Sequence, residues 1–513
     1  MNTASADSEI ELKLRIPREA VQRVVTHPLL RSGTPPVSRK LYSIYFDTPD
    51  LDLWRHGIAL RVRKEGARWM QAVKGGGTAR GGLHRRIELE TEVSGPLPDC
   101  AAIGGGVFGG LFSSPGLCVR LKPVFVTEFD RQSRMITLKP DVKVEVCADC
   151  GEIKCGDSVE PISEIELELK SGPSSQLYEI ALKFLDSLPL AIENRSKAER
   201  GYALLRGDTP LPVKAHAAAL TAEMPVSDAF KATAWAGLDH LQANERGVLG
   251  SRDPEYLHQA RVALRRLRSI FGVFADVLSE PETAPLVREL EWLADRLGPA
   301  RDWDVFMTEV LPPILREPGN HDGLSAFKKR CALLRQAAKR RARHALRSQR
   351  YQRLILMLSG WLVAESPPGH GNEPVLAALR APTLDFAAAV LEEQYSRVRK
   401  RGRKLRHLSF AELHRLRIAI KKLRYAVDFF AMLFDAKPVD RMRAPLVCLQ
   451  DILGAINDAT TVAALIAGVD AKSGTAMAEA RSIVIGWSGE RAETLKRELH
   501  SAWKPFHDCG KFW

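Results

Sequence analysis

The sequence predicts an α+β protein with at least two domains, a β-rich first part followed by an all-helical second part. Within residues 1–205, short alternating segments are bounded by Gly, Pro and Asp, which is typical of strands. From about residue 225, Ala, Leu and Arg recur at helical spacing and strand signals nearly vanish. A length of 513 residues exceeds what one hydrophobic core supports. We therefore expect domains at 1–205 and 225–513, joined by a linker at 206–224.

The first expected strand, residues 9–16, alternates strictly between charged and apolar side chains. Successive side chains of a strand point to opposite faces, so Glu9, Glu11 and Lys13 share one face and Leu12 lies on the other. Further strands are expected at residues 41–46, 58–63, 69–73, 85–93, 142–147 and 162–170. Residues 174–188 are expected to form a helix, and the glycines at 75–77 and 104–106 to form loops.

Several of these strands repeat the charged face of the first. The residues concerned are Arg61 and Arg63, then Arg86, Glu88 and Glu90, then Lys143 and Glu145, and finally Glu164, Glu166 and Glu168. An open sheet whose polar face meets water also alternates, and it remains the simpler interpretation for any single strand. Five such strands, with few Ser, Thr, Gln or Asn among the charges, favour an enclosed face where acids meet bases.

An enclosed face of this composition suits a polyphosphate bound together with a metal. Arg and Lys neutralise phosphate groups, and Arg forms bidentate pairs with their oxygens. Clustered Glu side chains bind hard divalent cations such as Mg²⁺ or Mn²⁺. The sequence contains no Walker loop, which excludes a P-loop ATPase.

The order of these charges resembles the CYTH family, the triphosphate tunnel metalloenzymes. The motif residues are Glu9, Glu11, Lys13, Arg61, Arg63, Lys74, Arg86, Glu88, Glu90, Arg131, Glu145, Glu164, Glu166, Glu168, Ser196 and Lys197. The resemblance covers residues 1 to about 205. It implies an eight-stranded antiparallel tunnel barrel that hydrolyses or cyclises triphosphorylated substrates.

The resemblance also assigns roles within the tunnel. Metals would be held by Glu9, Glu11 and members of the set Glu164, Glu166 and Glu168, which leaves the exact metal pair open. Phosphate oxygens would be held by Lys13, Arg61, Arg63, Lys74, Arg86, Arg131 and Lys197. Lys13 would also take part in catalysis, with Glu88, Glu90 and Glu145 orienting the bases or assisting the metal. The alternative for each of these residues is an ion pair that only stabilises the barrel.

The expected triphosphate is inferred from recognition residues that the sequence lacks and from the family resemblance. Recognition of adenine or thiamine needs aromatic or hydrogen-bonding groups at the tunnel mouth, and we identify no such set. Long CYTH proteins with a helical second half resemble bacterial inorganic triphosphatases. We therefore expect hydrolysis of inorganic tripolyphosphate to pyrophosphate and phosphate. The alternatives are a nucleoside triphosphate-processing enzyme, with adenylate cyclase less favoured, and a non-catalytic protein that binds polyphosphate or targets its granules.

The helical half contains an internal repeat. His258, Arg261, Arg265 and Arg268 have the spacing i, i+3, i+7, i+10 of one helical face, and His414, Arg417, Lys421 and Arg424 repeat it 156 residues later. At the same offset, Asp302 corresponds to Asp458. Further basic stretches lie at 328–350 and 397–406. A solvated basic face is the ordinary interpretation, but its repetition favours an anionic ligand because like charges on one face repel each other.

This repeat resembles the CHAD domain, a conserved-histidine helical domain, over about residues 225–513. The resemblance implies two four-helix bundles related by pseudo-twofold symmetry, with inorganic polyphosphate as the ligand of the basic faces. Nucleic acid is the rival ligand. Proteins that bind single-stranded nucleic acid usually place aromatic side chains among their basic residues, where the nucleobases stack on them. Aromatic side chains are scarce on the basic face of this repeat. No catalytic carboxylate cluster accompanies the bases, so we interpret this half as a binding module.

Bulk properties indicate a soluble protein of a reducing compartment. The net charge of +13 lies almost wholly after residue 205, where we expect the anionic partner. The N-terminus does not look like a signal peptide, and no apolar run reaches about 18 residues, so we expect a cytoplasmic protein, at polyphosphate granules in one variant of this hypothesis. Cys147 and Cys150 form an isolated CxxC pair, interpreted as incidental thiols, with zinc as the alternative.

Overall fold

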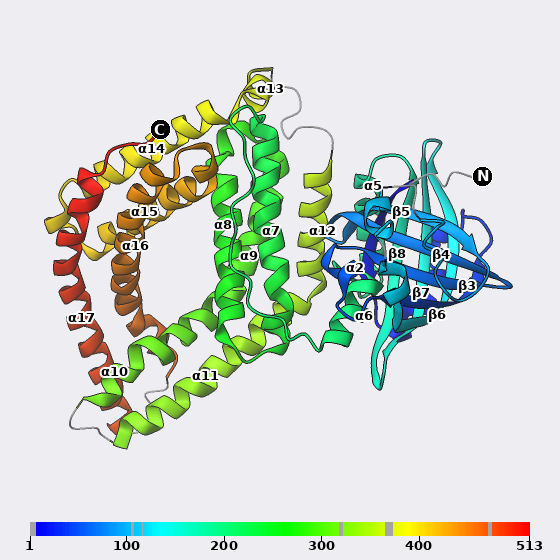
Figure 1. Ribbon diagram of the computed structural model, residues 1–513. Coiled ribbons are helices and arrows are strands. Elements are labelled where there is room, and N and C mark those ends of the chain that lie inside the picture. Colours follow the sequence, from blue (N-terminus) through cyan, green and yellow to red (C-terminus); the bar gives the residue numbers. More distant parts are fainter. Residues whose placement is uncertain (1–6, 104–106, 115, 318–321, 365–372, 470–474) are drawn as a thin grey trace. The chain divides into compact units, whose positions relative to one another are not determined.

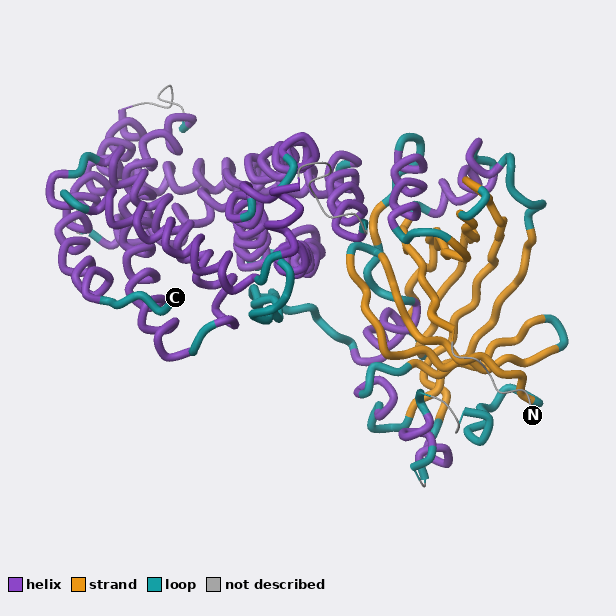
Figure 2. Tube along the Cα trace, turned by 90° about the horizontal axis from the view of Figure 1, so that it is seen from above, coloured by secondary structure: helices purple, strands orange, loops and turns teal. Residues whose placement is uncertain are grey.

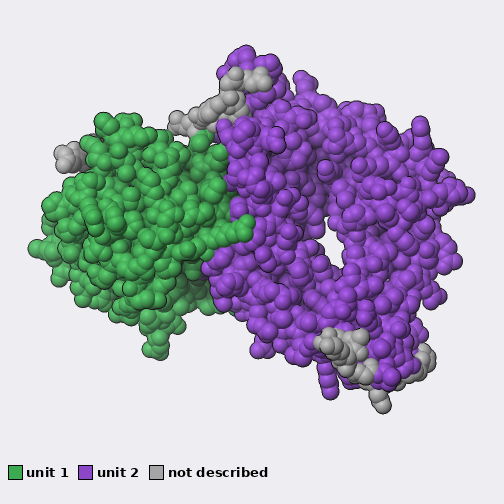
Figure 3. All heavy atoms as spheres, turned by 180° about the vertical axis from the view of Figure 1, so that it is seen from behind, with its two compact units in different colours: residues 1–210, 349–365 green, residues 211–348, 366–513 purple. Residues whose placement is uncertain are grey.

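The computed structural model describes residues 7–103, 107–114, 116–317, 322–364, 373–469 and 475–513. The chain divides into two compact units, which are coloured separately in Figure 3. The first comprises residues 1–210 and 349–365, and the second comprises residues 211–348 and 366–513. This division differs from the single boundary expected near residue 206, because residues 349–365 belong with the first unit.

The first unit is built on a closed antiparallel barrel. Its strands are β1 (Asp7–Arg15), β2 (Val37–Asp47), β3 (Ala59–Glu65), β4 (Arg68–Arg80), β5 (Leu83–Val93), β6 (Lys122–Lys139), β7 (Val142–Cys155) and β8 (Ser158–Ser171). They pair in the order β5-β4-β3-β2-β6-β7-β8-β1, and β1 also pairs with β5, which closes the ring (Figure 2). The predicted eight-stranded antiparallel barrel is confirmed.

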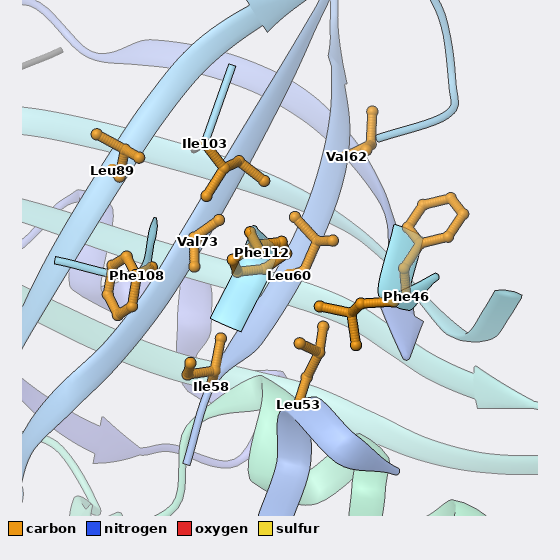
Figure 4. Close-up of a cluster of buried hydrophobic side chains, with 11 residues drawn as sticks. Phe46, Leu53, Ile58, Leu60, Val62, Val73, Leu89, Ile103, Phe108 and Phe112 are labelled. Carbon is orange, nitrogen blue, oxygen red and sulfur yellow. The ribbon is translucent and has the colours of Figure 1, made fainter. Parts of the chain in front are cut away.

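The barrel is polar inside, and much of its apolar packing lies outside the wall. Leu60, Val62 and Val73 leave the strands on the face opposite Arg61 and Arg63, and they pack with side chains from the loops and short helices (Figure 4). The partners of this cluster include Leu53 of α2 (Asp52–Arg55), Phe112 of α3 (Gly109–Phe112) and Leu117 of α4 (Leu117–Arg120). Burial of these outward side chains stabilises the wall, so the interior is free to carry charge.

Two helices bring later parts of the chain to the barrel wall. α6 (Lys197–Arg206) packs against β6, β7 and β8 and begins with a capping box in which Ser196 and Glu199 exchange hydrogen bonds. α5 (Ser175–Leu185) confirms the helix expected at 174–188. The short helix α1 (Val21–Val25) and the short strand β9 (Ala191–Ile192), which pairs with β1, complete the unit.

A helix from the middle of the second predicted domain belongs to this first unit. α12 (Gln349–Val363) packs on α5 and β9, where Gln352 Oε1 accepts a hydrogen bond of 3.1 Å from Ile192 N. Gly360 of α12 lies against Tyr178 of α5, so closely that a Cβ atom there would come within 2.9 Å of the Tyr178 side chain. The apolar run 354–364 is therefore the buried face of a packing helix.

The second unit is helical and consists of two sets of four helices. In the first set α7 (Val226–Gly250), α8 (Pro254–Val273), α9 (Glu280–Val305) and α11 (Asp322–Arg347) pack in sequence, and in the second set α14 (Thr383–Gly402), α15 (Phe410–Phe430), α16 (Ala436–Leu465) and α17 (Thr475–Asp508) do the same. The short helix α10 (Leu311–Arg316) lies between α9 and α11 in the chain, and α13 (Glu373–Arg380) precedes α14. The first copy of the sequence repeat lies on α8 and α9, and the second lies on α15 and α16.

Two details differ from the sequence-based expectations. The glycines at 75–77 lie within β4 at a register shift, and a Cβ on Gly77 would approach Arg85 O to 1.8 Å, so only glycine fits there. Strand β6 was not expected, because its middle, residues 130–134, is polar on both faces. The loop expected at 104–106 lies outside the described residues.

The cysteines and one apolar helix add two further findings. Cys100 and Cys118 are joined by a disulfide, whereas Cys147 and Cys150 are free. Among the described residues, the segment 436–468, which contains α16, is long and apolar enough to cross a membrane by length and composition alone, with a mean hydropathy of 1.2 over an 18-residue stretch. This segment also carries buried side chains at helical spacing, including Leu446, Leu449 and Leu453, which pack in the second four-helix set.

Candidate functional site

A cavity of about 240 Å³ lies inside the barrel and is lined mainly by charged side chains. Its bases are Lys13, Arg61, Arg63, Lys74, Arg86, Arg131, Lys170 and Lys197, and its acids are Glu9, Glu11, Glu88, Glu90, Glu166 and Glu168. The bases of the lining outnumber its acids, and further buried acids behind the lining, among them Asp149 and Glu164, pair with these bases. Alternation on β1, β3, β5 and β8 places these side chains inward, as the sequence pattern predicts.

The region beside α6 concentrates the most deeply buried charges. Lys197 donates to Asp149 Oδ2 at 2.7 Å and to Glu166 Oε1 at 2.9 Å, and it also contacts Glu164. Arg131 holds Asp149 in a bidentate pair, with Nε–Oδ1 and Nη2–Oδ2 distances of 2.8 and 2.7 Å. These contacts fix the two cations in place before any ligand arrives.

Opposite charges keep these buried groups ionised. Burial lowers the pKa of Lys13, but Glu11, at 2.7 Å, and Glu166 outweigh that effect and raise the pKa above its ordinary value. The same balance holds for Lys197, where Asp149 and the neighbouring Glu side chains overcome burial and raise the pKa. Burial raises the pKa of Glu166, but Lys13, Lys197 and Arg131 together hold it well below the ordinary range.

The opposite wall carries a second group of bases that Glu88 positions. Its carboxylate accepts from Lys74 Nζ at 3.0 Å and from Arg61 Nη2 at 3.3 Å. Arg86 pairs with Glu199 of α6 at 2.9 Å. The buried Nε atoms of Arg61 and Arg63 have no hydrogen-bond acceptor among the described residues. These donors are available to an anion in the cavity.

Like charges face each other across neighbouring strands on one side of the cavity. Glu11 of β1 and Glu145 of β7 both lie directly opposite Glu168 of β8 in the strand register. Burial, with Glu9 and Glu145, raises the pKa of Glu168, although Lys170 opposes that rise. Carboxylates directly opposite one another repel, and a divalent cation relieves that repulsion. The donor set of Glu9, Glu11 and Glu168 therefore suits a hard cation.

A second set of acids lies close enough to hold a metal. Oxygens of Asp149, Glu164 and Glu166 lie within 4.8 Å of one another and are buried. Each of these acids contacts two or more cations, among them Arg200, whose Nη1 lies 2.9 Å from Glu164 Oε2. Among the described residues, Glu9, Glu11 and Glu168 each pair with one lysine, namely Lys74, Lys13 and Lys170. A metal at the second set would therefore have to displace more cations.

The cavity brings together all but two of the CYTH motif residues; Lys143, which was also placed on a charged strand face, is exposed and lies outside the lining. Glu164 is fully buried behind Lys197 and Arg200 and does not line the cavity. Glu145 also lies outside the lining and pairs with Lys170 at 3.4 Å. Both act on the site through a cation that they contact.

In the second unit, bases of both repeats converge. Arg261 and Arg265 of α8 lie within electrostatic reach of Arg417 and Lys421 of α15. Burial, followed by Arg417 and Arg265, lowers the pKa of Lys421 to about 7. These four residues, called the central cation cluster below, experience mutual repulsion that an anion would relieve.

Two carboxylates, Asp302 and Asp458, accompany this cluster. Asp302 and Asp458 occupy equivalent positions in the two repeats, and burial, with a contribution from Asp458, raises the pKa of Asp302. Arg261 Nη2 lies 3.8 Å from Asp302 Oδ1. The interval of 156 residues marked this pair in the sequence, but their proximity depends on how α9 and α16 pack.

The remaining residues of the repeated motif have other partners. Arg268 pairs with Glu291 at 3.0 Å and Arg424 with Asp428 at 2.6 Å. His414 Nδ1 lies 2.8 Å from Asn457 Oδ1. His258 lies near Arg301, and burial, together with this charge, lowers its pKa. The helical face is thus divided into a central cluster and outer bases that already have carboxylate partners.

Comparisons with known proteins agree with this architecture. Residues 7–202 match the model of the CYTH domain, and residues 232–467 match the model of the CHAD domain. The chain joins a CYTH domain to a CHAD domain. A solved CHAD domain from the plant Ricinus communis is 30% identical, with a TM-score of 0.52, over 59% of this chain and 99% of that chain.

Two curated relatives match different shares of the chain. An inorganic triphosphatase of Haemophilus influenzae is 34% identical over 169 residues, which are 32% of this chain and 46% of the relative. An uncharacterized protein of Mycobacterium tuberculosis is 26% identical over 428 residues, 76% of this chain and 75% of the relative. The match therefore spans about half the length of the triphosphatase and three quarters of the mycobacterial protein.

Several residues of the CYTH domain site were not expected from the sequence. Asp149 and Arg200 hold the cations beside α6, and Glu199 holds Arg86. Asp149 lies on β7, two residues beyond the expected strand end, and Arg200 lies one helical turn after Ser196. Glu199 could have been found, because Ser196 and Glu199 form the signature of a capping box.

Proposed function

We propose that the CYTH domain is a metal-dependent hydrolase that cleaves inorganic tripolyphosphate to pyrophosphate and phosphate inside the barrel. The observation that carries this proposal is the cavity, where an excess of fixed bases meets a row of mutually repelling carboxylates. The first group suits a polyanion and the second suits a divalent cation. The match to an inorganic triphosphatase supports the same class of substrate.

The bases of the cavity hold the triphosphate. Lys13, Arg131 and Lys197 bind one end beside α6, and Arg61, Arg63, Lys74 and Arg86 bind along the opposite wall. Carboxylate partners hold these bases in place before the substrate binds. Little reorganisation is therefore needed when negative charge develops on the leaving phosphate. Glu88 acts as a positioning residue, since it touches Arg61 and Lys74 together. Glu90, 3.6 Å from Arg61, assists it.

Glu9, Glu11 and Glu168 are the residues that would hold Mg²⁺ or Mn²⁺. The bound metal supplies charge neutralisation and activation of the attacking water. Glu166 and Glu164 are less suited, because Glu166 contacts three cations and Glu164 contacts two, whereas Glu9, Glu11 and Glu168 each pair with one lysine among the described residues. Glu145 supports the site through Lys170.

The walls favour an inorganic substrate over a nucleotide. Tyr45 and Phe129 are the aromatic side chains that line the cavity, and both are buried. The Tyr45 ring stacks on Phe125, with 4.5 Å between centroids, and the Phe129 ring carries Lys197 at 4.8 Å. Neither offers a free face for a base. The cavity of about 240 Å³ is also smaller than typical sites for drug-sized ligands.

We further propose that the CHAD domain binds inorganic polyphosphate at the central cation cluster. The lowered pKa of Lys421 supports this, because it reflects positive charges held together without enough acid to balance them. The motif residues Arg268 and Arg424 contribute less, since each already has a carboxylate partner. His258 and His414 lie beside the cluster, and in this proposal they position the side chains around it.

The catalytic proposal is tested by phosphate release from tripolyphosphate, ATP and long-chain polyphosphate, with and without Mg²⁺. The intact protein should release phosphate from tripolyphosphate only with the metal, and Glu11→Ala should reduce the rate by about 10²-fold or more. Glu152→Ala is the matched control, because this β7 glutamate lies outside the cavity lining. Release from ATP alone, cyclic nucleotide formation, or no release at all would overturn the proposal.

The binding proposal is tested separately by equilibrium binding of long-chain polyphosphate. Arg417→Gln combined with Arg265→Gln should lower the affinity by at least tenfold and reduce the dependence on salt concentration. Arg397→Gln is the control, since Arg397 is exposed and pairs with Glu393 on α14. Equal affinities for these proteins would contradict the assignment of the cluster.

A further inference from the structure

A second basic cavity lies in the helical unit, between α14 and the C-terminal end of α17. It has a volume of about 680 Å³ and is lined by Ser396, Arg399, Lys400, Arg403, Trp503 and Lys511, among others. None of these belongs to the duplicated motif. Residues 503–511 also lie beyond the segment that matches the CHAD model, residues 232–467. The basic stretch 397–406 therefore contributes to a site that the repeat does not explain.

The bases of this cavity are poorly balanced by acid. Among the described residues that line it, Glu392 is the one carboxylate, and it accepts from Lys511 Nζ at 2.9 Å and from Trp513 Nε1 at 3.1 Å. Lys400 and Arg403 have no carboxylate within 4.0 Å among the described residues. Glu392 thus balances Lys511, and the charges of the α14 bases remain open to an anion.

The wall that carries these bases is held by close packing. The Trp503 ring lies so near α14 that a Cβ on Gly402 would approach it to 2.0 Å. Phe506 packs on Tyr395, with ring centroids 5.6 Å apart. Arg399 Nη1 donates to the backbone oxygen of His507 at 3.2 Å. The end of α17 is therefore fixed against α14, and the helix positions that carry the bases are set before a ligand binds.

We propose that this cavity binds a di- or triphosphate group. Guanidinium and ammonium donors of one helix turn match the tetrahedral oxygens of adjacent phosphates, and the Ser396 hydroxyl adds a neutral donor. The volume lies within the range of small-ligand sites. Arg399 and Lys511 already lie over the Tyr395 ring, at 5.9 and 5.6 Å, so that ring is not free to stack a base. Recognition therefore rests on the phosphates.

The test compares two double variants of the full chain, in EDTA so that turnover does not consume the probe. Lys400→Ala with Arg403→Ala removes two bases of the cavity, and Arg397→Ala with Lys404→Ala removes two exposed bases of the same segment that lie outside its lining. Tripolyphosphate and ATP are titrated by calorimetry. We expect the cavity variant to lose one binding equivalent, or at least tenfold in affinity at one site, and the control to match the wild type.

Each arm of the titration identifies a source or rejects the site. If the cavity variant loses one binding equivalent with both probes, the cavity binds a triphosphate group whether it is free or part of a nucleotide. If the loss occurs with tripolyphosphate alone, the ligand is an inorganic phosphate anhydride. If it occurs with ATP alone, the ligand is a nucleotide. Identical titrations for both variants and the wild type would overturn the proposal. A single-stranded oligonucleotide is titrated in the same way, and a loss of binding by the cavity variant with this probe alone would also overturn the proposal. Arg403→Glu provides a second check, since charge reversal at this exposed position should abolish the same equivalent.

Discussion

Lys13 in the barrel and Lys421 in the helical unit have opposite electrostatic environments. Burial lowers the pKa of both, but Glu11 and Glu166 raise the pKa of Lys13 above its ordinary value, whereas Arg417 and Arg265 lower the pKa of Lys421 further, to about 7. The acids of the barrel outweigh the effect of burial on Lys13, whereas the two aspartates beside the helical cluster do not outweigh it for Lys421.

This difference indicates two ways of binding a polyanion. In the barrel, carboxylates hold each cation at a fixed position, which suits a reaction whose transition state needs precise charge placement. In the central cation cluster, repulsion is relieved when an anion arrives, which suits binding without chemistry. Two acids, Asp302 and Asp458, keep that cluster from being purely basic.

The comparison is tested most strongly by removing each lysine. Lys13→Met should lower the free energy of unfolding by about 3–5 kcal/mol, because it leaves Glu11 buried without its cation. Lys421→Met should change it by less than about 0.5 kcal/mol or stabilise the protein, because it removes a repelled charge. Chemical denaturation measures both. Glu11→Gln added to Lys13→Met should recover part of the loss; equal destabilisation by the two single variants would contradict the comparison.

A second prediction concerns α12, through which the first unit depends on a segment of the second predicted domain. Gln352→Met should lower the free energy of unfolding of the first unit by about 1–3 kcal/mol, since it leaves Ile192 N without an acceptor in a buried position. Arg353→Met is the control on the same helix, because its pair with Asp186 is exposed. A thermal melt that resolves the unfolding of the two units measures the effect. Similar losses of stability for both variants would show that α12 does not stabilise the barrel unit.

The third prediction uses pH. Lys421 is protonated below pH 7 and neutral above it, and a polyanion favours the protonated form. Polyphosphate affinity should therefore fall as the pH rises from 7 to 8, by at most tenfold, with uptake of up to one proton on binding. Lys421→Arg should remove this dependence, because arginine stays charged in this range. Titrations above pH 7 separate this effect from His258, whose pKa lies below its ordinary value.

The smallest expected effect distinguishes outer bases from the central cluster. Arg268→Gln should change polyphosphate affinity by less than about twofold, because Arg268 is already paired with Glu291 at the surface. Arg417→Gln, which removes a charge of the cluster, should have a clearly larger effect. Salt titrations of both variants measure the difference, and a larger effect at Arg268 would move the binding surface away from the cluster.

The sequence predicted the barrel well where one face of a strand is charged and the other apolar. Alternation around Glu11, Arg61 and Glu166 is direct, because a strand has a period of two. Strand β6 was not predicted, since its middle, residues 130–134, is polar on both faces. The segment containing Gly77 resembled a loop, but its glycines permit a bulge inside β4.

The site was predicted as a set of residues and less well as a set of partners. Lys197 was expected as a phosphate ligand, and the cavity lining includes it. Its pairing with Asp149 could not be foreseen, because they come from different elements 48 residues apart. Glu145 and Glu164 share the pattern of their neighbours, yet burial and strand position direct them to Lys170 and Arg200.

The sequence by itself determined the division into a charged barrel and a duplicated basic helical region, because local periodicity and an exact offset of 156 residues are properties of the chain alone. Only the tertiary structure decided which charges neutralise one another. It placed Glu11 and Glu145 opposite Glu168 in the sheet and brought Arg265 close to the basic side chains of α15. It also packed α12 against α5 and β9. The reason is physical, since electrostatic interaction depends on distance and burial in the folded chain, and spacing along the sequence fixes neither.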